Sequence, residues 1–391
     1  MKETNEFLMP EYYLHFSCKM GACRSACCEG WPISVSMTNY FRLLGLDCEQ
    51  SMRRRLDVGL RVVDHPTPEC YARFNPRYDG NCPMRMEDGR CSIHASIGED
   101  ELPDICRLYP RGIRTDADKE CSCANSCEAV LEMLAEYKEP MRFVRRTITV
   151  DVPDTGKRTT LFDTLGRGQK IRMTLVRFLQ DRRHSLRERL ACLYAVTEQI
   201  ACALEEKNGD AIDAAAARAE AGETFPPQLM VSDRDSVLRS LDVLGEMAAL
   251  LTERHDSIRD YGEAALAYYG EGDDRFLRWQ KAQQHFRELF PDWEIWFEQM
   301  LVNHIFFTRF PFQERPVSLP DESNALCAVY AVLRYIGLAY MADKTEKSDF
   351  VDAAAACFRM IDHTDFEPYA AVLLKHYGVT SDAERKKLLS I

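Results

Sequence analysis

The chain has 391 residues, of which 46% are hydrophobic, 29% charged and 10% aromatic, a composition typical of soluble globular domains. This composition excludes a largely disordered chain, a collagen-like fibre and a coiled-coil rod, and the length suffices for roughly two or three domains. The formal net charge of −12 argues against general binding to nucleic acid or anionic lipid and suits basic partners.

The sixteen cysteines are distributed unevenly along the chain. No run of about eighteen apolar residues predicts a membrane span, and the first residues lack the order of a signal peptide, which favours the cytoplasm. In that reducing compartment, a dense cysteine block predicts metal binding or redox chemistry in preference to a disulfide framework. The block contains Cys18, Cys23, Cys27, Cys28, Cys48, Cys70, Cys82, Cys91, Cys106, Cys121, Cys123 and Cys127.

The cysteine-rich segment extends from about Phe7 to Arg142 and is interrupted by many turn-forming residues. Few stretches in it carry a long apolar period, and the predicted helices are Met37–Leu44, after the cap-like Ser36, and Cys127–Tyr137. We expect metal–thiolate bonds to hold such a loop-rich domain together. The clearest strand follows it, at Thr147–Val150.

A boundary near Pro153 divides the chain into a cysteine-rich metal-binding domain at residues 1–152 and an α-helical domain at residues 153–391. In the second part, apolar residues recur at three- and four-residue spacing. The predicted helices are Arg172–Leu179, Ser185–Lys207, Asp210–Ala221, Ser236–Arg254, Asp274–Leu289, Trp293–Arg309, Asn324–Ala342, Ser348–Met360, Pro368–Tyr377 and Ser381–Leu389. The predicted fold is therefore mainly α, with a loop-rich N-terminal cysteine-cluster domain followed by an α-helical C-terminal domain.

The first group of cysteines contains Cys18, Cys23, Cys27 and Cys28, and Gly21 leaves room for a turn that would bring thiolates to one metal. Adjacent residues of an extended segment point in opposite directions. Cys27 and Cys28 are therefore better placed to serve two sites, or one site and a spare thiol, than to bind the same iron.

The second group contains Cys82 and Cys91, which a hairpin closed by Asp88-Gly89 would bring together, and it continues to Cys106. A third group opens the following helix and contains Cys121, Cys123 and Cys127. The residues by themselves predict a thiolate-rich metal site. Several polar residues among the cysteines could orient or deprotonate an amine, although a structural role is the preferred interpretation for each, because no spacing distinguishes any of them: Tyr109, Glu87, Asp88, Asp104 and His94.

At these residues the chain resembles the flagellin lysine-N-methylase family, part of a wider group with zinc- or iron-chelating cysteine domains. The resemblance covers roughly residues 9 to 142. It rests on the ordered series of Cys27-Cys28, Gly30-Trp31, Cys82-Pro83, Cys91-Ser92-Ile93, Cys106-Arg107-Leu108-Tyr109-Pro110-Arg111 and Ser126-Cys127-Glu128. The metal ligands that it implies are Cys18, Cys23, Cys27, Cys28, Cys82, Cys91, Cys106 and Cys127. Cys48, Cys70, Cys121 and Cys123 lie outside the family pattern.

The resemblance implies an iron–sulfur protein, with a 4Fe-4S cluster expected and zinc as the alternative, that methylates lysine ε-amino groups of flagellin with S-adenosylmethionine. No Gly-rich turn after the first strand of a parallel sheet is visible, and Gly270-Glu271-Gly272 is interpreted as a helix–helix loop. We therefore expect an unconventional cofactor site. Two other functions remain open: a non-catalytic zinc- or iron–sulfur-binding interaction module, and a redox or metal-handling protein.

Overall fold

The computed structural model describes residues 2–24, 27–29, 33–115, 118–151, 164–223, 232–312 and 317–391. The described chain forms two compact units. The N-terminal unit contains the residues up to Val130 and the strand that begins at Phe143, and the helical unit contains residues 131–142 and the rest of the C-terminal part. The boundary predicted between residues 152 and 153 lies outside the described residues.

The larger sheet of the N-terminal unit has the strand order β5-β6-β1-β7. Strand β1 (Lys2–Pro10) pairs along its whole length with β7 (Phe143–Asp151) in antiparallel register, from Lys2 opposite Asp151 to Pro10 opposite Phe143. Strand β6 (Glu120–Cys123) runs parallel to β1, and β5 (Arg111–Arg114) pairs antiparallel with β6. The predicted strand at residues 147–150 is confirmed as part of β7, whose β-branched residues suit a pleated surface.

A second, smaller sheet of order β2-β4-β3 consists of β2 (Ile33–Val35), β4 (Ala72–Phe74) and β3 (Leu60–Val62). Helix α1 (Met37–Leu44) begins as predicted, because the Ser36 hydroxyl accepts a hydrogen bond from the Asn39 backbone N–H at 3.3 Å. Helix α2 (Gln50–Gly59) was not predicted. The inward side chains of these elements form an apolar core that the sequence analysis did not anticipate.

The helical unit confirms the prediction of a mainly α fold. Each helix predicted beyond Pro153 is present, with its bounds shifted by a few residues. A further helix, α10, lies between α9 and α11 in the chain. Residues Gly270–Gly272 connect α10 to α11, as predicted. The helices are α6 (Gly168–Leu179), α7 (Leu186–Glu205), α8 (Gly209–Ala221), α9 (Arg234–Arg254), α10 (Arg259–Tyr269), α11 (Arg275–Leu289), α12 (Trp293–Thr308), α13 (Leu319–Tyr340), α14 (Lys347–His363), α15 (Phe366–His376) and α16 (Asp382–Leu388).

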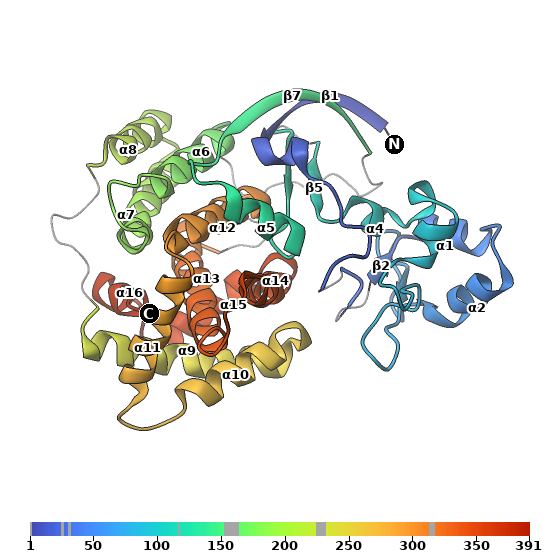
Figure 1. The fold of residues 1–391 in the computed structure, drawn as a ribbon. Coiled ribbons are helices and arrows are strands. Elements are labelled where there is room, and N and C mark those ends of the chain that lie inside the picture. The colour runs from blue at the N-terminus through green and yellow to red at the C-terminus, as the bar shows by residue number, and fades with distance from the viewer. Residues whose placement is uncertain are drawn as a thin grey trace. The chain divides into compact units, whose positions relative to one another are not determined.

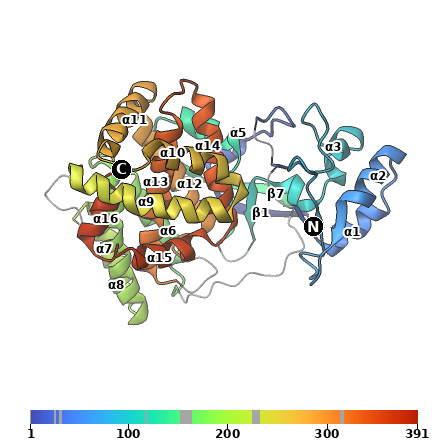
Figure 2. The same ribbon diagram turned by 90° about the horizontal axis from the view of Figure 1, so that it is seen from below.

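Helix α13 lies at the centre of this unit (Figure 1). Every residue from Glu322 to Ala339 is buried, because α13 is covered on all sides. Figure 2 shows α9 and α10 beside it, and the helices that contact it are α7, α9, α10, α11, α12, α14, α15 and α16. A helix enclosed in this way must bury every charge that it carries.

No helix among the described residues is long and apolar enough to cross a membrane.

Glu298 on α12 holds the ends of several helices together. Its side chain is 0% exposed and lies 2.6 Å from Nη1 of the buried Arg189 and 2.9 Å from Nη2 of Arg182. Arg189 also donates to the backbone carbonyl of Leu179 at the end of α6. This carboxylate therefore joins α12 to the beginning of α7 and the end of α6.

We expect Glu298→Gln to destabilise the helical unit by about 3–5 kcal/mol, because a buried charge loses its partner while the neighbouring shape is kept. The measurement is chemical denaturation followed by circular dichroism. The control is Lys170→Met, which removes an exposed ion pair with Asp213 and should cost less than about 1 kcal/mol. Equal losses in the two variants would contradict this assignment.

Candidate metal site

None of the sixteen cysteines forms a disulfide. The segments that carry the predicted ligands are short loops and single helical turns of the N-terminal unit. Cys91 precedes the first turn of α3 (Ser92–Ser96), Cys106 lies in α4 (Asp104–Leu108), and Cys127 directly precedes α5 (Glu128–Glu136). The cysteines therefore do not share one face of a sheet or helix. The packing of the loops against one another decides which thiols lie close together.

Four of the predicted ligands form a first thiol set, which consists of Cys28, Cys82, Cys91 and Cys106. The backbone N–H of Cys82 donates to the carbonyl of Cys28 at 2.8 Å, which fixes these two segments side by side. Cys82 belongs to the apolar core of the smaller sheet, and the other three thiols pack against that core. The structure thus gathers residues from three loops that are separated by up to 78 positions in the sequence.

The predicted turn at Asp88-Gly89 is present and holds Cys82 and Cys91 near each other. The Met86 N–H donates to the Arg90 carbonyl at 2.9 Å, and residues Arg85 and Cys91 form an antiparallel bridge. Gly89 has φ +84°, and a Cβ atom there would lie 2.5 Å from the carbonyl oxygen of Gly21. The loop that carries Cys18 and Cys23 therefore packs directly against this turn, because both contact positions are glycine.

Cys18, Cys23 and Cys127 form a second thiol set. Burial raises the pKa of Cys127 to about 12, and the neighbouring Cys23 and Cys18 thiols add to the shift. Burial likewise raises the pKa of Cys23 to about 11, with Glu128 and Cys18 as further causes. The Glu128 carboxylate is itself buried and lies 2.8 Å from Nζ of Lys19.

Cys27 lies between the two sets. A hydrogen bond to Cys28, burial and the charges of Cys28, Cys106 and Cys18 all raise its pKa. The same hydrogen bond lowers the pKa of Cys28, although burial opposes the shift, and Arg85 lowers it further. Seven of the eight predicted ligands therefore belong to one of the two thiol sets, and Cys27 has neighbours in both.

Burial and mutual repulsion dominate the first set. Burial raises the pKa of Cys106 well above its ordinary value, and the charges of Cys82, Cys91 and Cys28 add to the effect. Burial also raises the pKa of Cys82 to about 12. Thiols with such pKa values stay neutral at pH 7 unless a cation is close to them.

Among the described residues, no group of three or more His, Cys, Asp or Glu side chains has an arrangement that could hold a metal ion.

The four cysteines outside the family pattern are placed differently. Cys48 packs against the apolar core, and the Cys70 thiol donates to the Ser34 hydroxyl at 3.6 Å. Cys121 and Cys123 lie on β6 and are fully buried. Burial raises the pKa of Cys121 to about 12, while a hydrogen bond from Tyr13 lowers it.

The polar residues that could act on an amine are mostly engaged elsewhere. Tyr109 shares a 2.9 Å hydrogen bond with Ser126. The hydrogen bond from Arg90 lowers the pKa of the exposed Asp88. Burial raises the pKa of Asp104, but hydrogen bonds from Asn39 and Arg107 outweigh it and leave the pKa below its ordinary value. Glu87 is exposed and His94 half-buried.

A second cluster of ionisable residues lies in the helical unit and was missed by the sequence analysis. Nδ1 of His304 on α12 lies 2.8 Å from Asp362 on α14, and Nε2 lies 3.1 Å from Glu367 on α15. Glu322 on α13 is 1% exposed. The four residues come from four helices, so no sequence motif joins them. The sequence could indicate the cluster only through ionisable residues at helix positions that the apolar periodicity predicts to be buried.

The environment of this cluster shifts two of its pKa values upward. Burial alone would lower the pKa of His304, but hydrogen bonds to Asp362 and Glu367 and their charges raise it to about 10. Burial raises the pKa of Glu322 to about 8, the charge of Glu367 adds to this, and His304 opposes it. At neutral pH the cluster therefore contains a protonated histidine and a largely protonated Glu322.

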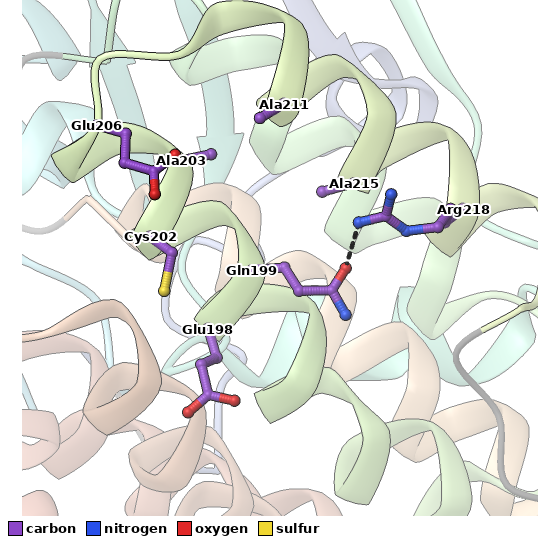
Figure 3. A pocket seen from close by; sticks show the side chains of 8 residues that line it. All are labelled: Glu198, Gln199, Cys202, Ala203, Glu206, Ala211, Ala215 and Arg218. Atoms are coloured by element: carbon purple, nitrogen blue, oxygen red, sulfur yellow. Dashed lines mark hydrogen bonds between the residues drawn. The ribbon is translucent and has the colours of Figure 1, made fainter.

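A shallow surface depression of about 380 Å³ lies between α7 and α8. Figure 3 shows Arg218 donating to Gln199 across it at 2.8 Å, with Cys202 and Glu206 further along α7. It contains none of the predicted site residues.

The fold and the thiol sets define a mainly helical protein with a cysteine-rich N-terminal unit. The family profile described as the FliB lysine N-methylase C-terminal domain matches residues 172–387, which is more than half of the chain. The chain therefore belongs to the FliB lysine N-methylase family, and the predicted resemblance is confirmed. The match covers the helical part, where the sequence analysis found no motif.

Comparison with curated proteins gives relatives of low identity. The chain is 25% identical over 148 residues to a lysine-N-methylase of Salmonella choleraesuis, which covers 36% of this chain and 35% of that protein. It is 27% identical over 106 residues to the flagellar biosynthetic protein FliU of Salmonella muenchen, which covers 27% of this chain and 62% of that protein. The chain thus spans about a third of the length of the first relative. No solved structure matches it.

The raised pKa values of Glu322 and His304 predict that the helical unit loses stability as the pH rises from about 4.5 to about 10. For both groups the folded-state pKa exceeds the unfolded one, so the stabilisation is present at low pH and is lost as the pH rises through about 10 for His304 and about 8 for Glu322. Denaturation of the wild type and of Glu322→Gln at several pH values checks this. The variant should show a shallower decline, and parallel profiles would contradict the role of Glu322.

Proposed function

We propose that this protein transfers methyl groups from S-adenosylmethionine to lysine ε-amino groups of flagellin. The observation that carries the proposal is the match of residues 172–387 to the lysine N-methylase family. The name of the curated relatives, lysine-N-methylase, supports the reaction class. The name of FliU, a flagellar biosynthetic protein, supports a flagellar substrate.

The charge of the chain is compatible with this substrate class. A net charge of −12 attracts a cationic lysine side chain during its approach. We further propose that the reaction takes place in the cytoplasm, the compartment that the sequence analysis favours.

The lysine nitrogen must lose a proton before it can accept a methyl group, because the ε-ammonium has a reference pKa of about 10.4 and no free lone pair. A dry pocket or a nearby acceptor would favour the neutral amine, and the amine must then align with the methyl carbon and the sulfonium sulfur. The lone pair of the nitrogen forms the new bond, while the electrons of the carbon–sulfur bond remain on sulfur and leave a thioether. No conventional Gly-rich cofactor turn was predicted from the sequence, so we expect the cofactor to bind in another way.

We further propose that the N-terminal unit holds an iron–sulfur cluster. The donor set supports this, since one buried and three half-buried thiols without disulfides match the number of ligands that a 4Fe-4S cluster takes. Cys28, Cys82, Cys91 and Cys106 would hold one cluster. The second thiol set with Cys27 would supply a second site. A bound cluster would supply structural order for these loops or an open iron atom for a cofactor group.

Cys82→Ser should lose the iron and acid-labile sulfide of the first thiol set and should melt at a lower temperature, because metal binding and folding are coupled in such sites. The measurement is metal and sulfide analysis with thermal melting, on protein purified without oxygen. Cys27→Ser should behave similarly, while Cys192→Ala in the helical unit should keep the iron. Unchanged metal content in Cys82→Ser would contradict the ligand assignment, and colourless wild-type protein with stoichiometric zinc would favour a zinc-binding interaction module.

The methylation itself is tested by incubating the anaerobically purified protein with flagellin and S-adenosylmethionine and measuring the mass of flagellin peptides. We expect methyl groups on lysine residues only, and none when the cofactor is omitted. A flagellin mass that stays unchanged with metal-loaded protein would refute the enzymatic function.

A further inference from the structure

Arg334 on α13 is a buried cation without a carboxylate partner. The residue is 1% exposed, and its Nε, Nη1 and Nη2 atoms have no hydrogen-bond partner among the described residues. A guanidinium carries five N–H donors and stays charged in proteins. Burying it unpaired costs several kcal/mol by rough estimate, so a structure retains such a group only for a reason.

Aromatic rings surround the guanidinium and account for part of its stabilisation. Its central carbon lies 4.0 Å from the ring centre of Trp293, 5.5 Å from that of Phe286 and 5.7 Å from that of Phe297. Cation–π contacts of this kind stabilise the cation, yet they leave the N–H donors unsatisfied. The rings therefore hold the cation in place without using its hydrogen-bonding capacity.

Another buried arginine of the same unit, Arg189, has the carboxylate partner that Arg334 lacks. Arg189 is 3% exposed and lies 2.6 Å from the Glu298 carboxylate. Arg334 has the same burial and no such anion among the described side chains that it contacts.

The surroundings of Arg334 add positive charge and further donors. Arg287 and Arg187 lie close enough to lower its pKa, in addition to the larger effect of burial. The hydroxyl groups of Tyr330 and Tyr269, which also influence that pKa, are buried without a hydrogen-bond partner among the described residues. Arg287 is exposed and Arg187 half-buried, so the positive charge continues to the surface of the unit.

We infer that Arg334, with the hydroxyl of Tyr330, forms an anion-binding site that takes the carboxylate or phosphate of a small ligand. A carboxylate or phosphate accepts two parallel hydrogen bonds from one guanidinium, which matches the free donors of Arg334. The identification of this carboxylate with that of S-adenosylmethionine rests on the proposed function. The anion site itself does not.

Replacing Arg334 by methionine separates a binding role from a structural role. Substitution of a buried charge by an apolar residue of similar size is often neutral or stabilising when the charge has no partner. Arg334→Met should therefore melt at or above the temperature of the wild type when no ligand is added. The matched control, Arg189→Met, removes a paired buried arginine and should melt at a lower temperature.

The test adds S-adenosylmethionine, its decarboxylated analogue or inorganic phosphate to the full-length wild type and variants, and measures melting temperature and binding by calorimetry. We expect S-adenosylmethionine to stabilise the wild type and Arg189→Met, and its affinity to fall about tenfold or more in Arg334→Met, the loss expected for a charge-assisted pair. The decarboxylated analogue should bind weakly, and equally, to both the wild type and Arg334→Met. Arg334→Lys, which keeps the charge but not the two-pronged geometry, should bind S-adenosylmethionine with intermediate affinity and provides a second variant.

Stabilisation by phosphate alone, lost in Arg334→Met, would uphold the anion site and assign it to a phosphate-bearing ligand. Equal binding of every probe to wild type and Arg334→Met would overturn the site. The site would also be overturned if no probe stabilised the wild type and Arg334→Met melted at as low a temperature as Arg189→Met. Arg334-dependent binding without methylation of flagellin would refute the proposed function and leave the site intact.

Discussion

The enclosure of α13 is the constraint on which the helical unit depends. Because the surrounding helices cover it, Glu322 and Arg334 of α13 are removed from water, and each must find a partner or remain uncompensated. The unit meets this demand in different ways. The Glu298 carboxylate on α12 is paired with two arginines, and His304 lies between two carboxylates. Arg334 has aromatic neighbours but no anion, and its donors are therefore available to a ligand.

In the N-terminal unit the corresponding constraint is close approach of backbone segments. Gly21 and Gly89 lie against each other so tightly that a side chain at either position would collide with the opposite loop. This contact places the loop of Cys18 and Cys23 against the turn that carries Cys91. An apolar core supports the same turn from the side of Cys82, so the thiols are gathered by packing as well as by any metal. The unit therefore combines both sources of stability.

The family assignment illustrates the difference between a motif and a fold. The cysteine series in the first third of the chain carries the recognisable resemblance to the family, because a thiolate ligand requires a cysteine at its position. The helical part needs only apolar residues of suitable size at suitable intervals, so many sequences satisfy it and no short motif remains. The profile nevertheless matches that part, over residues 172–387.

The sequence by itself determined the local features. The apolar period fixed the helices of the second unit, Ser36 fixed the start of α1, Asp88-Gly89 fixed a turn, and the β-branched residues near Ile148 fixed part of a strand. These features depend on interactions between residues a few positions apart, which a single sequence displays.

Only the tertiary structure decided which distant residues meet. The pairing of β1 with β7, the division of the thiols into two sets, the four-helix cluster around His304 and the unpaired state of Arg334 all join segments far apart in the chain. Periodicity shows that a position is buried but not what faces it, because the facing residue is set by the packing of whole elements.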